Sequence, residues 1–270
     1  MYPILFKIPV PGFLEGTFGE YFTVYSYGFF IVLGAISGIV YLSYQTKKKF
    51  GLPFDQVNSL FLLLLLAAVV GGKVFLYFED PSRYANNFKG LISGRGFVFY
   101  GSLLFCIPTM LYFFKKNKLP TFKMLDLMAI TACLVHVFGR MGCFMAGCCH
   151  GVKWHGPWAV TFTDPVCQAK PLHTPLHPTQ LYSVVLILTI LIALFLFKKY
   201  QRFDGQLFLT YLMLYALGRS VIEVFRGDLS RGFVIGDYVS NSQFISFLVL
   251  VITGYFYVKF YKKSVTTSAK

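Results

Sequence analysis

Two arginines lie inside stretches of the chain that are otherwise almost entirely apolar. Arg140 follows His136 by four residues, so both side chains lie on one face of a predicted helix. Arg219 stands four residues before Glu223, and Arg226 follows three residues later, which places these three on one face of a second helix. A guanidinium group binds phosphate through two parallel hydrogen bonds. The two faces therefore predict a site for a phosphate-bearing ligand.

The free-energy cost of placing charged side chains in apolar segments limits the roles that they can have. A charged side chain near the centre of a bilayer costs roughly 3 kcal/mol or more, so it normally faces the interior of a helix bundle and has a partner or a ligand. One interpretation is purely structural, with Arg219 and Glu223 as a buried ion pair that locks two helices. Against it, Glu223 cannot neutralise Arg140 as well, although both arginines lie near the same end of their segments. A surplus of positive charge at head-group depth favours a phospholipid ligand.

The elements that must position these residues are apolar segments long enough to cross a membrane. The chain has 270 residues, of which 56% are hydrophobic and 13% charged, and its mean hydropathy is +0.62. This composition is too apolar for a soluble domain. A spanning helix needs roughly 20 mostly apolar residues. Seven segments meet or approach that length, and they cover residues 22–45, 57–78, 97–114, 124–145, 179–198, 205–225 and 236–260.

The basic residues alternate along the chain in a way that orients these segments. Lysine-rich runs follow every second segment, at 47–49, 115–123, 198–202 and 259–270. Basic loops stay in the cytoplasm, so the N-terminus is predicted to lie outside and the C-terminus inside. A nucleic-acid-binding protein would instead collect its net charge of +14 on one folded face, and we expect no nucleic-acid partner.

The loops on the other side are longer, at 79–96, 146–178 and 226–237. Function is found more often where loops are elaborate. The fold class that follows is an all-α polytopic membrane protein with about seven transmembrane helices and elaborated external loops. We expect a single membrane-embedded domain over residues 1–270.

A cluster of cysteines invites interpretation as a metal site. Cys143, Cys148, Cys149 and His150 lie close in sequence. Structural zinc sites favour paired ligands such as C-x₂-C, which this cluster lacks, and adjacent cysteines rarely bind one ion together. Thiol chemistry near the site is a second alternative, and small packing residues are the interpretation that the spacing favours. The sequence therefore predicts no metal site here.

Four motifs follow one another along the chain: YG at 27–28, GRMGCFMAG at 139–147 with Gly151 behind it, HPTQLY at 177–182 and GRSVIEVFR at 218–226. In this order they resemble the motifs of the bacterial prolipoprotein diacylglyceryl transferase family, and the resemblance covers nearly the whole chain.

The resemblance implies an activity and a place in the cell. A diacylglyceryl group would pass from phosphatidylglycerol to the lipobox cysteine thiol of a preprolipoprotein, with release of glycerol phosphate and without a metal or organic cofactor. The enzyme would be a multi-pass protein of the bacterial cytoplasmic (inner) membrane.

The resemblance also implies roles for residues. Arg140 and Arg219 would bind the donor phosphate and stabilise charge as the C–O bond breaks, with Glu223 orienting Arg219. Tyr27 and Gln180 would be polar contacts of the substrate. The remaining predicted substrate-binding residues are Gly151, which permits close backbone approach, Lys73 and Arg226, which add positive charge, and Cys143.

Departures from the family pattern concern the acceptor. The stretch Phe99-Tyr100-Gly101-Ser102 carries tyrosine where the family usually has histidine, so Tyr100 is predicted to take the catalytic position. Tyrosine, with an unperturbed pKa near 10, is the poorer base at neutral pH. Cys143, Ala146 and Cys148 stand where the family's signature has two asparagines and an acidic residue.

Three alternatives follow from these departures. The same fold and donor could serve a different nucleophilic acceptor, or the protein could bind membrane lipid without catalysis. An anion transporter would also bury arginines, but it would predict inverted repeats, and the sequence shows no internal repeat.

Overall fold

The computed structural model describes residues 2–11, 20–84, 88–93, 96–226, 233–235 and 239–268. The chain divides into two compact units. Unit 1 combines Met1–Gly38 with Leu125–Lys270, and unit 2 is Ile39–Met124. Both consist predominantly of helices. The single domain expected from the sequence stays a prediction.

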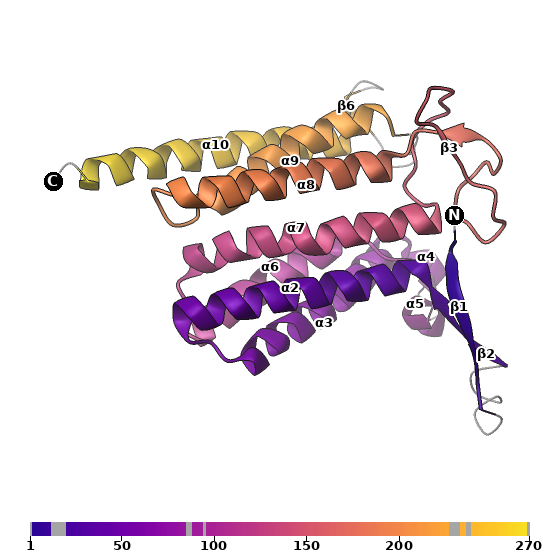
Figure 1. Ribbon diagram of the computed structural model, residues 1–270, viewed down its shortest axis with the longest axis horizontal. Coiled ribbons are helices and arrows are strands. Elements are labelled where there is room, and N and C mark those ends of the chain that lie inside the picture. Colours follow the sequence, from indigo (N-terminus) through magenta and orange to yellow (C-terminus); the bar gives the residue numbers. More distant parts are fainter. Residues whose placement is uncertain are drawn as a thin grey trace. The chain divides into compact units, whose positions relative to one another are not determined.

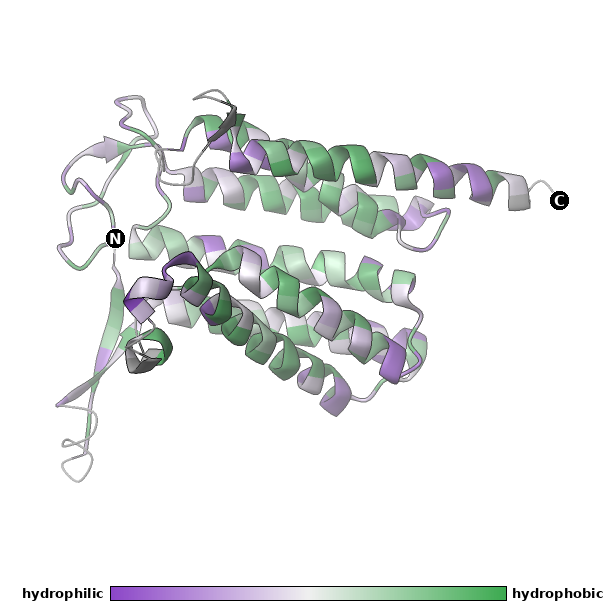
Figure 2. Cartoon of the chain, turned by 180° about the vertical axis from the view of Figure 1, so that it is seen from behind, coloured by the Kyte–Doolittle hydropathy of each residue, from purple (hydrophilic) through white to green (hydrophobic). Residues whose placement is uncertain are grey.

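The helices have the length and composition of membrane spans. Within the described ranges, six helices are long and apolar enough to cross a bilayer, which confirms a helical multi-pass membrane protein. Figure 2 shows apolar residues along their lengths and hydrophilic ones concentrated near helix ends and in the connecting loops. These helices are α2 (Ser26–Phe50), α3 (Phe54–Glu79), α7 (Thr121–Ala146), α8 (Thr179–Phe197, extended by the 3₁₀ turn η2, Lys198–Tyr200), α9 (Gln206–Val224) and α10 (Asn241–Ser268).

The third expected segment, 97–114, is a helix but not one of these six. It forms α6 (Phe99–Lys116), whose 18 residues end in Lys115 and Lys116, so its apolar part is shorter than roughly 20 residues. The count of seven spans and the placement of the termini stay predictions.

The first expected segment began too early in the sequence. Residues 21–25 form strand β2 (Tyr21–Tyr25), which pairs antiparallel with β1 (Ile4–Pro9), and α2 begins only at Ser26. Aromatic and β-branched residues fill β2, and such side chains favour strands. The last expected segment began at 236, and residues 236–238 lie outside the described residues.

Unit 2 is organised by close contact between two helices. Helix α6 packs along α3. In the sequence, the two helices are separated by the short helices α4 (Pro81–Tyr84) and α5 (Phe88–Ser93). A side chain at Gly71 would lie 2.4 Å from the carbonyl oxygen of Gly101, and one at Gly101 would meet the carbonyl of Gly71 at the same distance. Small residues at such a crossing let two backbones approach, as is common between membrane helices. The Ser102 hydroxyl donates to the Ala68 carbonyl across this contact at 2.8 Å.

In unit 1, helices α8, α9 and α10 run side by side (Figure 1). The long loop between α7 and α8 contains strands β3 (Val160–Thr161) and β4 (Pro175–Leu176), which pair antiparallel. A second small pair, β5 (Phe233–Ile235) and β6 (Val239–Ser240), precedes α10. The loop has its own small core, made by Phe162, Cys167, Ala169 and Leu176.

A buried carboxylate in α7 holds the connection between α8 and α9. Asp126 accepts hydrogen bonds from the backbone N–H groups of Gly205 at 2.8 Å and Phe208 at 3.0 Å, and from the Gln201 side chain at 2.6 Å. Gly205 and Phe208 stand at the start of α9, where N–H groups lack partners within the helix. Asp126 therefore caps α9 from a neighbouring helix.

This arrangement predicts that Asp126→Ala destabilises the protein. It would leave the amide groups of Gly205 and Phe208 unpaired, at roughly 1–3 kcal/mol for each buried group. We expect the thermal unfolding midpoint of the detergent-solubilised protein to fall by several degrees, and Asp126→Asn to recover part of the loss. The exposed Asp55 provides the control, since Asp55→Ala removes the same charge without a cap. Equal midpoints for the two alanine variants would contradict the capping role.

Candidate functional site

The end of helix α7 sets the positions of two cysteines. The N–H of Cys148 bonds the carbonyl of Cys143 at 3.1 Å, and the N–H of Gly147 bonds that of Phe144 at 3.2 Å. With Gly147 at φ +77°, this pattern is a Schellman motif, in which the side chains at the positions of Cys143 and Cys148 meet. A β-carbon at Gly147 would also press on Phe162 at 3.1 Å.

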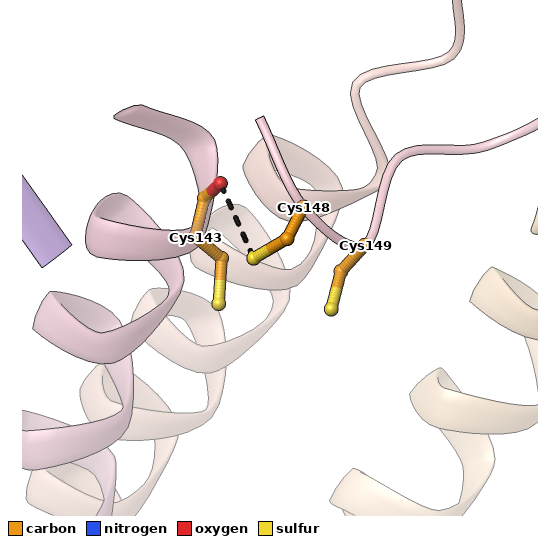
Figure 3. A group of neighbouring side chains, drawn as sticks. All are labelled: Cys143, Cys148 and Cys149. Carbon is orange, nitrogen blue, oxygen red and sulfur yellow. Dashed lines mark hydrogen bonds between the residues drawn. The ribbon is translucent and has the colours of Figure 1, made fainter. Parts of the chain in front are cut away.

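The next residue brings in a third thiol. Cys149 has φ +62°, a left-handed conformation that is unusual for a residue with a side chain. The sulfur atoms of Cys143, Cys148 and Cys149 all lie within 4.8 Å of one another (Figure 3), and the Cys148 sulfur lies 3.7 Å from the Cys143 carbonyl oxygen. The pKa of the Cys149 thiol is lowered by interactions with the other two thiols and by the positive charges of Arg226 and Arg140.

The start of helix α8 fixes the backbone of this cysteine turn. The Thr179 hydroxyl donates to the Cys149 carbonyl at 2.7 Å, and the Gln180 side-chain nitrogen donates to the Cys148 carbonyl at 2.7 Å. Gln180 is 0% exposed, and its side-chain oxygen has no hydrogen-bond partner among the described residues. An acceptor buried in this way can receive a hydrogen bond from a ligand.

Gly151 joins the loop to the end of α9. Its N–H bonds the His177 carbonyl at 2.8 Å, and it forms an antiparallel bridge with Arg226. A β-carbon at Gly151 would lie 2.2 Å from the Phe225 carbonyl oxygen and 2.7 Å from the β-carbon of His177. The predicted close approach at Gly151 is therefore an approach of backbone to backbone within the protein.

His177 is a structural element of the loop. Its ring stacks on Trp154 at a centroid distance of 4.7 Å, and its Nδ1 lies 2.9 Å from the Tyr182 hydroxyl. Burial lowers the pKa of His177, so the imidazole stays neutral near pH 7. The neutral ring therefore packs at the start of α8 and supplies no charge to the site.

Arg140 extends from α7 toward the helix that carries the second arginine. Its Nε donates to His136 Nε2 at 3.3 Å, and the His136 ring lies 5.3 Å from the Tyr215 ring of α9. Both Arg140 and Arg219 are close enough to His136 to interact with it electrostatically. Tyr27 of α2 lies against the same turn of α7, since a β-carbon at Gly142 would be 3.3 Å from its ring.

Arg219 and Arg226 share one carboxylate. Arg219 forms an ion pair with Glu223 and donates to the Ser242 hydroxyl at 3.3 Å, and Arg226 Nε lies 3.9 Å from the same Glu223 oxygen. These three side chains are only 3–11% exposed. Arg140 and Arg219 thus bring two guanidinium groups near His136, and Glu223 forms an ion pair with one of them. The surplus of positive charge suits an anionic group such as phosphate.

Most of the predicted site residues thus belong to one compact unit. Unit 1 holds eight of them: Tyr27, Arg140, Cys143, Gly151, Gln180, Arg219, Glu223 and Arg226. Tyr100, which is 48% exposed, and Lys73 belong to unit 2, so their participation stays a prediction. No sequence pattern indicated Ser242 as a partner of Arg219, because a serine near the start of a helix is common. The anchoring role of Thr179 is visible only once the loop is folded.

Comparison with known proteins identifies the family of the chain. The model of the family described as prolipoprotein diacylglyceryl transferase matches residues 17–259. The chain is similar to the phosphatidylglycerol–prolipoprotein diacylglyceryl transferase of Clostridium tetani, with 32% identity over 93% of this chain and 95% of the relative. It is also similar to transferase 2 of Clostridium perfringens, with 30% identity over 86% and 90%, and to the Campylobacter lari transferase, with 29% identity over 89% and 92%. The chain belongs to the prolipoprotein diacylglyceryl transferase family.

Proposed function

We propose that this protein transfers the diacylglyceryl group of phosphatidylglycerol to the cysteine thiol of a prolipoprotein. The names of its relatives state this donor and this acceptor. The observation that carries the proposal is the charge imbalance in unit 1, where Arg140 and Arg219 both lie within electrostatic reach of His136 and Glu223 forms an ion pair with Arg219. A phosphodiester would supply the missing negative charge.

The proposed chemistry uses the arginines when the bond breaks. The acceptor sulfur attacks the glyceryl carbon, and the C–O bond to phosphate breaks with its electron pair on the phosphate oxygen. Arg140 and Arg219 would stabilise that growing charge, which is a large term when donors are fixed in advance in a site of low dielectric. Glu223 and Ser242 hold Arg219 in place, so its guanidinium needs little reorganisation.

The head group offers hydroxyl groups as well as phosphate. The buried side-chain oxygen of Gln180 needs a donor, and a glycerol hydroxyl of phosphatidylglycerol would provide one. Tyr27 lies against α7 one helical turn from Arg140 and would contact the same ligand. In unit 2, Lys73 would add positive charge and Tyr100 would take part in proton transfer from the acceptor.

The proposed cellular setting is the bacterial inner membrane, with the arginine ends of α7 and α9 at the outer leaflet. The lysine runs at the opposite helix ends support this orientation, because basic loops are retained in the cytoplasm. The donor would then bind from the outer leaflet, where the acceptor arrives after export.

The test is a reconstituted reaction. The purified protein is incubated with phosphatidylglycerol labelled in its head group and with a lipobox peptide, and glycerol phosphate release and peptide mass are followed. We expect both signals together. Release without peptide modification would identify a different acceptor, and lipid binding without release would contradict the transferase. Movement of labelled anion across sealed vesicles, without chemistry, would identify a transporter instead.

Removal of either phosphate-binding arginine is expected to abolish turnover. Arg140→Ala and Arg219→Ala should each lower the rate of glycerol phosphate release by about 10²–10³-fold, the usual cost of losing one donor to a developing oxyanion. The matched control is Arg202→Ala, at the lysine end of the bundle, where Arg202 bonds the Tyr261 hydroxyl at 2.8 Å. Normal turnover in either site variant would show that the donor binds elsewhere.

A further prediction concerns the backbone contact between the α7–α8 loop and the end of α9. Gly151→Ala would force the Phe225 carbonyl away, because its β-carbon has no room at 2.2 Å. We expect weakened turnover and a lower unfolding midpoint. Gly254→Ala, at a position with nothing within 4 Å, is the control and should change neither value. If Gly151→Ala behaves like Gly254→Ala, the close approach has no role in holding the site.

A further inference from the structure

The proposed mechanism leaves unused the three thiols that lie together at the end of α7. We propose that Cys143, Cys148 and Cys149 bind one zinc ion as thiolates and that the open fourth position of this ion takes the acceptor cysteine. The metal site stands on geometry alone, and only the role of its fourth position rests on the proposed function.

Sulfur positions support a single ion. All three sulfur atoms lie within 4.8 Å of one another (Figure 3). Thiolates that share a zinc ion at about 2.3 Å stand about 4 Å apart, so a small contraction would complete the site. The side chains come from the last turn of α7 and from the residues just after it, on one side of the turn.

The backbone is already arranged to bring the thiols together. The Schellman motif places Cys148 over Cys143, and the hydrogen bonds from Gln180 and Thr179 hold the next two carbonyl groups. Cys149 reaches the group through a left-handed φ of +62°, a strained conformation for a residue other than glycine. Such strain persists where the surroundings impose it, and here it directs a third thiol toward the other two.

Ligand type and number both favour zinc with an open position. Thiolates are soft ligands and select zinc or copper(I) over calcium or magnesium. Among the residues that the structure describes, no fourth histidine, cysteine, aspartate or glutamate joins the group. Structural zinc sites close with four protein ligands, whereas catalytic ones keep three and leave the fourth position to water or substrate.

The surrounding charges suit such a complex. Zinc with three thiolates carries a net charge of −1. Arg140 and Arg226 both lie within electrostatic reach of the Cys149 sulfur. A negative metal centre beside fixed guanidinium groups is stabilised in a medium of low dielectric.

An open coordination position on zinc would activate the acceptor cysteine by holding it as a thiolate. A free thiol has a pKa near 8.5 and attacks only as the thiolate. Coordination to zinc deprotonates a thiol outright, with the proton passing to solvent. The bound sulfur then forms the S–C bond as the C–O bond of the donor breaks, and glycerol phosphate leaves with the bonding electron pair. A strong base is then unnecessary, which accords with a tyrosine at position 100.

Metal content of the full-length protein provides the first test. Protein purified in detergent without chelators, from cells grown with zinc, is analysed for bound metals by mass spectrometry. We expect about one zinc ion per chain. Cys143→Ala, Cys148→Ala and Cys149→Ala should each weaken zinc binding by about tenfold or more, and Cys106→Ala, in unit 2, should leave it unchanged. Zinc that survives the triple variant would overturn the site.

A measurement on the unmodified protein keeps the test independent of variant folding. Cobalt(II) added to metal-free protein should produce the intense near-ultraviolet absorption of cobalt–thiolate bonds at one equivalent. Absence of this absorption, with the three thiols still titratable by a thiol reagent, would overturn the proposal. A disulfide within the cluster that is recovered only on reduction would overturn it as well.

The role of the fourth position has its own test. A lipobox peptide should change the cobalt spectrum, and the same peptide with serine in place of cysteine should not. Identical spectra would overturn coordination of the acceptor. Full turnover by metal-free protein would overturn the zinc proposal while upholding the transferase. Stoichiometric zinc without glycerol phosphate release would uphold the metal site and contradict the transferase.

Discussion

The placement of Arg140 and Arg219 in apolar helices is the constraint on which the rest of unit 1 depends. Arg219 and Arg226 both approach one carboxylate, and Arg140 stands near the same helices without a carboxylate of its own in the described contacts. Charges in apolar segments are costly unless they are paired. The His136–Tyr215 contact and the hydrogen bond from Arg219 to Ser242 orient two of these side chains, but neither supplies negative charge. In the proposed function, an anionic ligand would supply it.

A second constraint is the way in which helix α7 ends. At the edge of a bilayer the last carbonyl groups of a helix need partners, and the Schellman motif at Gly147 supplies them within the chain. The same turn sends the following loop to the start of α8 and the end of α9, where Thr179, Gln180 and Gly151 fasten it. The turn therefore links three helices that carry site residues.

Both constraints meet at the cysteine cluster. The turn assembles the thiols, and the arginines supply a positive surrounding in which thiolates, or a thiolate-bound zinc ion, are favoured. Donor and acceptor would then be activated by neighbouring parts of one unit. The arginines would stabilise the leaving phosphate, while zinc would hold the attacking sulfur as a thiolate. Such a division of labour would explain why a family member can carry cysteines where asparagine and an acidic residue are usual.

Much of this protein can be predicted from sequence because a bilayer imposes strong local rules. Runs of apolar residues predicted six of the observed spanning helices, and the helical spacing of Arg219 and Glu223 predicted their ion pair. Family motifs indicated which polar residues belong to the site. Local sequence patterns predicted the structure less well in two places. The apolar run of α6 is close to the minimum length of a membrane span, and the aromatic residues of β2 are compatible with a strand as well as with a helix.

Only the tertiary structure decided how separate segments meet. The spacing of Cys143, Cys148 and Cys149 argued against a shared ion, because adjacent cysteines normally point in different directions. A left-handed turn, held by hydrogen bonds from a helix thirty residues further along the chain, brings their sulfur atoms together. The capping of α9 by Asp126 arises in the same way, across a large separation in sequence. The sequence by itself determined the helices and the charges that they carry, since those follow from local composition. The three-dimensional fold determined which of these groups share a site, since that depends on contacts between distant segments.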